Sequence, residues 1–249
     1  DTATTEIYTA GDSSAASDVY KRQTVVLDPE VARHAFSALR LRVGDPVVLA
    51  DGAGSVARAV LRTVASRSIE AEILAVRSEP VPAGGGVSLA LGILHSQAMD
   101  WAVQKAVEVG VRTFVPVRTE RSQLAGRAVR ARHDHWCRVA RQALKQCRRA
   151  WAMTVASPVK LEQLLAERGS AGGLVADPEG RPIGAWTDEV PHFLLVGPEG
   201  GLSPAELELL DTHEWPRVWL GPHILRADTA AVVGAAMLVA REEALGARD

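Results

Sequence analysis

The chain has 249 residues, of which 47% are hydrophobic and 23% charged, and its formal net charge is −2 at pH 7. These values are typical of an ordinary globular protein with room for one large or two modest domains, and we expect two. No apolar stretch approaches the ~20 residues that a membrane span requires, and no basic-then-apolar leader begins the chain. We therefore expect a cytoplasmic protein with no membrane partner.

The N-terminal third predicts a leader followed by a small β-rich domain. Residues 1–23 are rich in Ser, Ala, Thr and Asp and show no periodicity, which predicts a disordered or non-native leader. Asp28 and Pro29 predict the start of a helix that runs to about Leu39. Apolar or alternating runs predict strands at residues 24–27, 45–50, 55–64 and 68–76. The expected small domain thus covers residues 24–79.

A proline- and glycine-rich stretch at residues 80–86 predicts a linker to a second domain over residues 87–249. Beyond the linker, strand and helix patterns alternate, which favours an α/β domain with a mostly parallel sheet covered by helices. Strands are expected at 87–94, 113–116 and 174–177, and a helix at 96–109. The final helix, 229–244, is apolar nearly all round at its start, so we expect it to be buried against the sheet or against a second subunit.

The basic residues are concentrated in one helix. Residues 127–149 contain seven arginines and Lys145 against a single acidic residue, Asp134, although the whole chain is slightly acidic. Such a stripe is typical of a protein that binds a phosphate backbone, and a solvated helix face is the common alternative. His133 and His135 in this helix have no partners at zinc-ligand spacing, so we expect no metal.

Two short apolar runs near the C-terminus end in glycine-containing loops, at residues 192–201 and 218–226. In the first, three glycines surround Pro198 and Glu199, so the backbone can lie close against a ligand. Ser203-Pro-Ala-Glu206 follows with the spacing of a capping box and proline in the first helical position. Ligands of α/β proteins bind outside the carboxyl ends of such strands.

Neither the glycine spacing of a dinucleotide-binding loop nor that of a P-loop is present, which disfavours a nucleotide-dependent oxidoreductase. An ordinary tight turn remains the alternative for a single loop.

Together these loops resemble the C-terminal signature of the RsmE family, which belongs to the knotted SPOUT superfamily of RNA methyltransferases. The matching segments are 195–203 and 220–230. Upstream, residues 99–111, the Glu-Arg-Ser turn at 119–122, and the helix end at 142–148 are also similar to family motifs. One departure is Ala227-Asp-Thr229, where the family usually has Thr-Glu-Thr, so Asp228 keeps a carboxylate on a shorter side chain.

The resemblance implies a fold, a reaction and a cofactor. The expected fold is a knotted parallel-sheet SPOUT methyltransferase domain preceded by a small PUA-like β-barrel domain that helps to hold RNA. The implied reaction is S-adenosyl-L-methionine-dependent methylation of N(3) of a uridine in 16S ribosomal RNA of the small ribosomal subunit. Methylation of another RNA, on a ribose or on transfer RNA, and a non-catalytic RNA-binding protein are the alternatives. Separately, the nearly all-apolar stretch of small residues at 230–240 predicts a homodimer.

The resemblance also implies site residues. Arg226 is expected to stabilise charge on the uracil oxygens, with Glu199 and Asp228 as candidate proton acceptors. The expected cofactor-binding residues are Val196, Gly197, Pro198, Glu199, Gly200, Gly201, Leu220, Gly221, Ile224 and Leu225. The expected RNA-binding residues are Arg40, Arg42, Arg121, Lys145, Arg148 and Arg149. Asp177-Pro-Glu-Gly180 is interpreted as a plain turn, which would join the site only if its strand lies beside the two signature strands.

Overall fold

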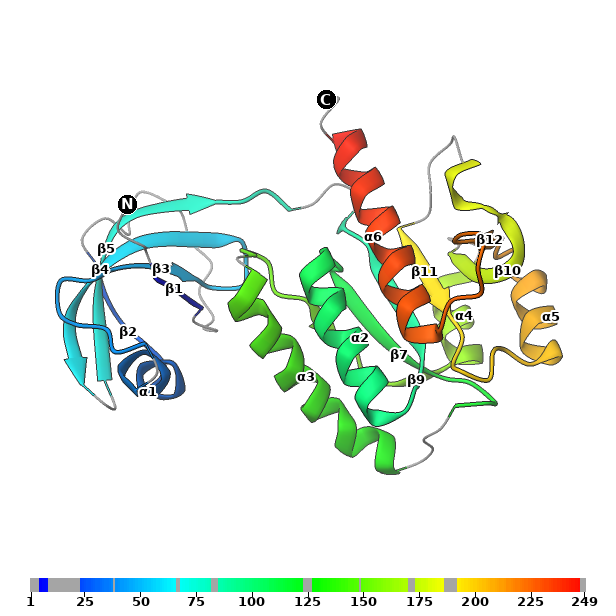
Figure 1. Cartoon of the computed structure of the whole chain (residues 1–249), viewed down its shortest axis with the longest axis horizontal. Helices are drawn as coiled ribbons and strands as arrows, with labels where there is room; N and C mark the ends of the chain where they lie inside the picture. The colour runs from blue at the N-terminus through cyan, green and yellow to red at the C-terminus, as the bar shows by residue number, and fades with distance from the viewer. Residues whose placement is uncertain are drawn as a thin grey trace. The chain divides into compact units, whose positions relative to one another are not determined.

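The computed structural model describes residues 5–8, 23–37, 39–65, 68–81, 85–122, 127–147, 149–169, 173–185 and 192–246. The chain divides into two compact units (Figure 1). Unit 1 comprises Asp1–Val81 and Leu144–Ala152, and unit 2 comprises Pro82–Ala143 and Met153–Asp249. The division between Val81 and Pro82 falls within the linker expected at residues 80–86.

Unit 1 is built on a five-stranded sheet with strand order β1-β3-β4-β5-β2. Its elements are β1 (Thr5–Tyr8), β2 (Thr24–Val26), α1 (Pro29–Ser37), β3 (Pro46–Ala50), β4 (Ser55–Ala65) and β5 (Ser68–Ser78). The β2–β5, β5–β4 and β4–β3 pairs are antiparallel. Inward-facing residues such as Leu61 and Ile69 form the core together with Ala32 and Ala35 of α1, all of them fully or almost fully buried. The predicted helix and strands of the small domain are therefore present.

Of the two alternatives predicted for residues 1–23, a disordered or a non-native leader, the first is wrong for Thr5–Tyr8. These four residues form β1, which pairs in parallel with β3 from Thr5 opposite Val47 to Tyr8 opposite Ala50. Threonine, isoleucine and tyrosine favour extended backbone, and the segment satisfies the edge of β3 that would otherwise be unpaired. Residues 1–4 and 9–22 of the expected leader lie outside the described residues.

Unit 1 also contains a segment that the prediction assigned to the second domain. The backbone of residues 150–152 pairs with the loop between β3 and β4, where Gly54 N donates to Ala150 O and Ala152 N donates to Gly52 O. The Trp151 indole nitrogen donates to Pro80 O at 3.0 Å. These bonds explain why Leu144–Ala152 belong to unit 1 although they lie more than sixty residues beyond its other strands.

Unit 2 is built on a seven-stranded sheet whose strand pairs are all parallel. The order is β12-β10-β11-β6-β7-β8, and β9 also pairs with β7. The strands are β6 (Ser88–Gly92), β7 (Thr113–Arg118), β8 (Thr154–Val155), β9 (Val159–Lys160), β10 (Leu174–Pro182), β11 (Phe193–Val196) and β12 (Arg217–Trp219). The expected α/β domain with a parallel sheet is confirmed.

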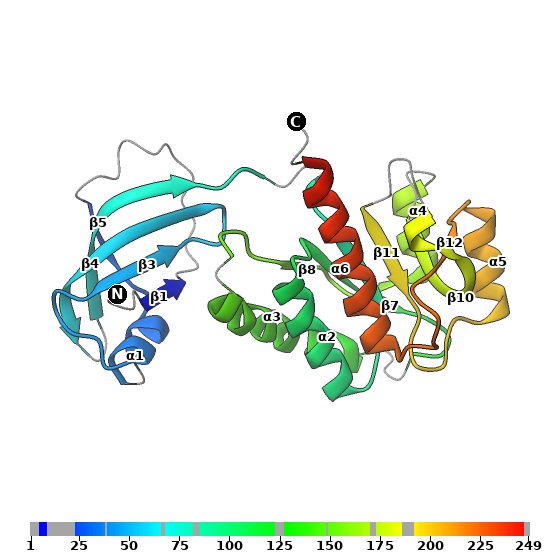
Figure 2. The same ribbon diagram turned by 45° about the horizontal axis from the view of Figure 1, so that its top comes forward.

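Helices cover both faces of this sheet (Figures 1 and 2). They are α2 (Ser96–Val109), α3 (Arg127–Cys147), α4 (Leu161–Arg168), α5 (Pro204–Thr212) and α6 (Ala227–Gly246), and a 3-10 turn, η3, spans Ile183–Ala185. Side chains alternate along β11, so Phe193 and Leu195 pack in one core with α4 and α5. The intervening Leu194 faces α6, where a Cβ on Gly234 would lie 2.5 Å from its Cδ2. The final helix is thus packed on the sheet, as its apolar sequence predicts.

Strand β10 lies between β11 and β12, so the condition for including the Asp177–Gly180 turn in the site is met. The β10–β12 register shifts between Ala176 and Arg181, and residues 177–180 bulge out of the ladder. Within the bulge, Asp177 Oδ1 accepts from Glu179 N at 2.8 Å. The interpretation of a plain turn is therefore incomplete, because the turn stands between the two signature loops.

Candidate functional site

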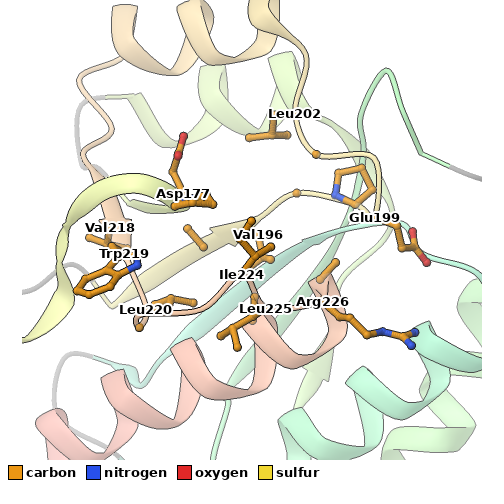
Figure 3. A pocket seen from close by; sticks show the side chains of 18 of the residues that line it. Asp177, Val196, Glu199, Leu202, Val218, Trp219, Leu220, Ile224, Leu225 and Arg226 are labelled. Carbon is orange, nitrogen blue, oxygen red and sulfur yellow. The ribbon is translucent and has the colours of Figure 1, made fainter.

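A cavity of about 670 Å³ opens beside the bulge of β10 and the ends of β11 and β12 (Figure 3). Three segments supply most of its wall: residues 176–178 in the bulge of β10, the loop after β11, and the loop after β12. Parallel strands bring their carboxyl ends to one edge of a sheet, which is where α/β proteins place ligands. Figure 3 shows Glu199 and Arg226 at one end of the cavity and Asp177 and Trp219 at the other. The cavity is therefore apolar along its length and carries charged groups at both ends.

The loop after β11 is a tight turn held against β6. Gly201 N donates to Pro198 O at 2.8 Å, which closes the turn. A Cβ on Gly92, the last residue of β6, would lie 2.5 Å from Pro198 N, so only glycine lets the two backbones approach this closely. Helix α5 then begins with the predicted capping box, in which Ser203 and Glu206 bond reciprocally.

Glu199 is anchored by the chain that precedes α2. Its Oε1 accepts from His95 N at 3.1 Å, beside the positive end of the helix dipole. This contact links the loop after β11 to the loop after β6. The Glu199 residue remains exposed and lines the cavity, so its second oxygen can face a ligand.

The loop after β12 carries four of the expected cofactor-binding residues and Arg226, which is expected to act on the substrate. Leu220, Gly221, Ile224, Leu225 and Arg226 all line the cavity. The Arg226 side chain is 76% exposed, and its Nε lies 3.4 Å from Asp228 Oδ1. The same Asp228 oxygen accepts from Thr229 N at 2.8 Å in the first turn of α6.

Of the ten expected cofactor-binding residues, all but Gly200 line the cavity. A Cβ on Gly200 would lie 3.3 Å from the Cβ of Arg121, so this glycine faces the Thr119–Ser122 turn. Asp228 also lies outside the lining, one residue beyond Ala227. The cavity wall includes residues that the sequence interpretation missed, namely Ala176, Asp177, Pro178, Leu202, Leu207, Val218, Trp219, His223, Ala227 and Ala230. The signal for Asp177 was its Asp-Pro-Glu-Gly turn at a strand end.

The expected RNA-binding residues fall into three groups. Arg40 and Arg42 are exposed in the loop after α1, and Arg40 has a left-handed backbone with φ of 52°. Lys145 and Arg149 lie at and beyond the end of α3, both half-buried, and Arg148 lies outside the described residues. Arg121 differs, because its guanidinium donates to the carbonyl oxygens of Gly200 and Leu202 at 2.8 and 3.4 Å.

The family described as the RNA methyltransferase domain matches residues 83–239, and the RNA methyltransferase PUA domain matches residues 27–74. Ribosomal RNA small subunit methyltransferase E of Mycobacterium bovis is 31% identical over 218 residues, covering 84% of this chain and 83% of that protein. The protein of the same name from Aquifex aeolicus is 36% identical over 139 residues, which cover 55% of this chain and 60% of that protein.

The chain belongs to the RsmE family of RNA methyltransferases. The crystal structure of ribosomal RNA small subunit methyltransferase E from Neisseria gonorrhoeae, bound to S-adenosyl methionine, matches it with a TM-score of 0.83 at 26% identity. That match covers 95% of this chain and 97% of the other. The family resemblance stated from the C-terminal loops and upstream motifs is confirmed.

Two further findings bear on partners of this RsmE-family chain. Within the described ranges, no group of three or more His, Cys, Asp or Glu side chains could hold a metal ion. No helix in the described part of the chain is both long and apolar enough to cross a membrane.

Proposed function

We propose that this RsmE-family chain transfers the methyl group of S-adenosyl-L-methionine to N(3) of a uridine in 16S ribosomal RNA of the small ribosomal subunit. The observation that carries the proposal is the apolar cavity between the loops after β11 and β12, with Arg226 at one end. The Neisseria gonorrhoeae relative is bound to S-adenosyl methionine. A ribosomal RNA substrate would place the activity in the cytoplasm.

The cavity fits this cofactor in size and chemistry. Its volume of about 670 Å³ lies within the range of small-molecule sites, roughly 300–1,000 Å³. Leu202, Val218, Leu220 and Leu225 offer apolar surface to a nucleoside. At Gly197, Gly201 and Gly221 no Cβ keeps a ligand away from the backbone. The side chains would thus fix the position of the cofactor and the backbone groups its orientation.

When bound, the cofactor supplies a methyl group on a positively charged sulfur that a nucleophilic nitrogen can attack. The uracil N(3)–H must lose its proton to become that nucleophile, which leaves negative charge on the two flanking carbonyl oxygens. Arg226 would stabilise this charge, because its exposed guanidinium is a fixed fork of donors beside the cavity. Glu199 and Asp228 are the candidate acceptors of the proton. Each already accepts a backbone hydrogen bond, so each is held in a fixed position.

RNA would be held by phosphate contacts from unit 1. Arg40 and Arg42 are exposed in the loop after α1, Lys145 lies in the last turn of α3, and Arg149 follows that helix. Cationic side chains of this kind supply the sequence-independent part of RNA affinity. Arg148 completes this set in the proposal by its position in the sequence.

We also infer a homodimer, in which α6 takes part. Met237 of α6 and Trp101 of the neighbouring α2 are each 41% exposed, and large apolar side chains exposed on adjoining helices are typical of a protein–protein contact. Static light scattering in dilute solution should give twice the 26.5 kDa of one chain. Met237→Glu should shift the mass toward one chain, whereas Leu74→Glu, at an exposed position of unit 1, should not. A wild-type monomer would contradict the dimer.

The function is tested by transfer of a tritiated methyl group from S-adenosyl-L-methionine to small ribosomal subunits that lack the modification. Mass spectrometry of the digested RNA should identify N(3)-methyluridine. Methyl groups found only on a ribose or on transfer RNA would refute the assignment to N(3) of a ribosomal uridine, although the chain would still be an RNA methyltransferase. If calorimetric titration with S-adenosyl-L-methionine detects no binding, the chain would instead be a non-catalytic RNA-binding protein.

A further inference from the structure

The Thr119–Ser122 turn after β7 is attached to the loop after β11 by the Arg121 side chain. Arg121 Nη1 donates to Gly200 O at 2.8 Å and, at 3.4 Å, to Leu202 O. Its aliphatic stem packs over Gly200, where an added Cβ would lie 3.3 Å from the arginine Cβ. One guanidinium nitrogen therefore satisfies carbonyl groups on both sides of Gly201.

Glu206 provides a second attachment between the same two segments. This carboxylate is 9% exposed, and its two oxygens accept from two different loops. Oε1 accepts from Glu120 N and Oε2 from Ser203 N, each at 2.8 Å. A charged acceptor between two backbone amides makes strong hydrogen bonds in a buried setting.

The turn itself is rigid enough to act as an anchor. Ser122 Oγ accepts from Thr119 N at 2.9 Å, and Ser122 N donates to Thr119 O at 3.2 Å. The turn directly follows β7, which is paired on both sides in the sheet of unit 2. The attachments therefore connect the glycine-rich loop to the core of the sheet.

A loop containing three glycines would otherwise have many accessible backbone conformations, and ordering it around a ligand would reduce affinity. Arg121 and Glu206 restrict the loop before any ligand arrives. The Arg121 guanidinium is bonded to the carbonyl oxygens of Gly200 and Leu202. In this it differs from the other arginines that the sequence assigns to RNA binding.

We propose that Arg121, together with Glu206, is a positioning residue that preorganises the Gly197–Leu202 loop for the cofactor, and that Arg121 does not bind RNA phosphate. The proposal rests on the proposed function for the identity of the ligand. The preorganisation itself concerns the chain without ligand, so it can be measured separately.

The first test is hydrogen exchange of the ligand-free chain, followed by mass spectrometry of peptides spanning residues 197–206. Arg121→Ala should speed exchange of this segment by about tenfold, because two hydrogen bonds to a charged group are lost. Arg121→Lys keeps a cation that can reach one carbonyl, so its exchange rate in this segment should lie between those of the wild type and Arg121→Ala. Arg62→Ala is the control, since it removes an exposed arginine that pairs with Glu72 in unit 1. Unchanged exchange in Arg121→Ala would overturn the proposal whatever the ligand is.

The second test compares cofactor and RNA affinities of the same variants. Arg121→Ala should raise the S-adenosyl-L-methionine Kd and KM about tenfold while kcat changes less, and RNA affinity with its salt dependence should stay unchanged. Arg62→Ala should leave the cofactor Kd unchanged, and Lys145→Ala should weaken only RNA binding. Weaker RNA binding with a reduced salt slope and an unchanged cofactor Kd in Arg121→Ala would make Arg121 a phosphate contact and overturn the proposal. A wild-type chain without cofactor affinity would refute the proposed function, yet faster loop exchange in Arg121→Ala would still establish the attachment.

Discussion

Single residues at the end of the cavity differ in how firmly the structure holds them. Glu199 is fixed through the His95 amide, whereas the Arg226 side chain is 76% exposed and contacts Asp228 through one nitrogen. Because the Arg226 side chain of this ion pair is exposed and Asp228 also accepts from Thr229 N, the pair contributes about 1 kcal/mol to stability. Arg226 is therefore free to turn toward a substrate without a large cost to the fold.

Arg226→Ala should slow methyl transfer by about a hundredfold or more, as expected when a donor to a developing negative charge is removed. The thermal midpoint, the Kd for S-adenosyl-L-methionine and the Kd for RNA should stay close to wild type, because the guanidinium acts mainly in the transition state. Single-turnover transfer of a tritiated methyl group separates the chemical step from binding. Arg226→Lys, which keeps the charge but not the fork, should recover part of the rate. A loss confined to RNA Kd would contradict a role in the chemical step.

The ionisation of Glu242 on α6 makes the stability of the folded chain depend on pH. Burial raises the pKa of this carboxyl above its ordinary value of 4.5, while nearby His192 and hydrogen bonds to the Gly86 and Val87 amides lower it in part. The side chain is 10% exposed. Because the folded state then binds the proton more tightly than the unfolded chain, stability falls as pH rises from 4.5 toward the raised pKa.

Glu242→Gln removes this ionisation, so the thermal midpoint of the variant relative to wild type should increase as pH rises through that window and stay constant above it. Calorimetric scans between about pH 4 and pH 8 measure the difference. Glu208→Gln, at an exposed position of α5, should leave the pH dependence unchanged. A midpoint difference that does not vary with pH would show that Glu242 is equally easy to ionise in both states.

At the scale of elements, apolar runs and turn residues predicted most strands and helices of both units, including the capping box that begins α5. The order of the strands is not contained in these local patterns, since pairing depends on side chains distant in sequence. Asp177 could thus be recognised as a turn residue, but only the position of β10 between β11 and β12 brings it to the cavity. Arg121 was assigned to RNA for the same reason, because its acceptors at Gly200 and Leu202 lie about 80 residues away.

The loop between β3 and β4 provides a test of element packing. Gly54 has φ of +98°, and a Cβ there would lie 2.4 Å from Trp151 Cζ2. Gly54→Ala should therefore destabilise the chain by about 2 kcal/mol or more, from backbone strain together with the clash. Gly44→Ala is the matched control, since its φ is +93° but nothing lies within 4 Å of the added Cβ. Gly44→Ala should lower the free energy of unfolding by only about 1 kcal/mol. Equal losses in chemical denaturation would show that Trp151 moves away freely.

For the whole molecule, the sequence predicted two domains and the division near residue 80, but not the crossing of Leu144–Ala152 into unit 1. That crossing depends on Trp151 and on backbone pairs with the β3–β4 loop, which no periodicity reveals. Its consequence is that Lys145 and Arg149 belong to the same unit as Arg40 and Arg42. The proposed phosphate contacts thus gather on the unit that matches the PUA domain, while the cavity proposed to bind the cofactor lies in the other unit.

This separation predicts that RNA affinity and cofactor affinity respond to different substitutions. Lys145→Glu and Arg149→Glu should each weaken RNA binding and flatten its dependence on salt by about one unit of slope, because each lost phosphate contact releases one counterion fewer. Neither should change the S-adenosyl-L-methionine Kd, since neither residue lines the cavity. Filter binding over a series of salt concentrations measures the slope, and calorimetry measures the Kd. Arg62→Glu, with the same change of charge on β4, should alter the slope less. An equal change in all three variants would mean that net charge alone, and not these positions, governs RNA binding.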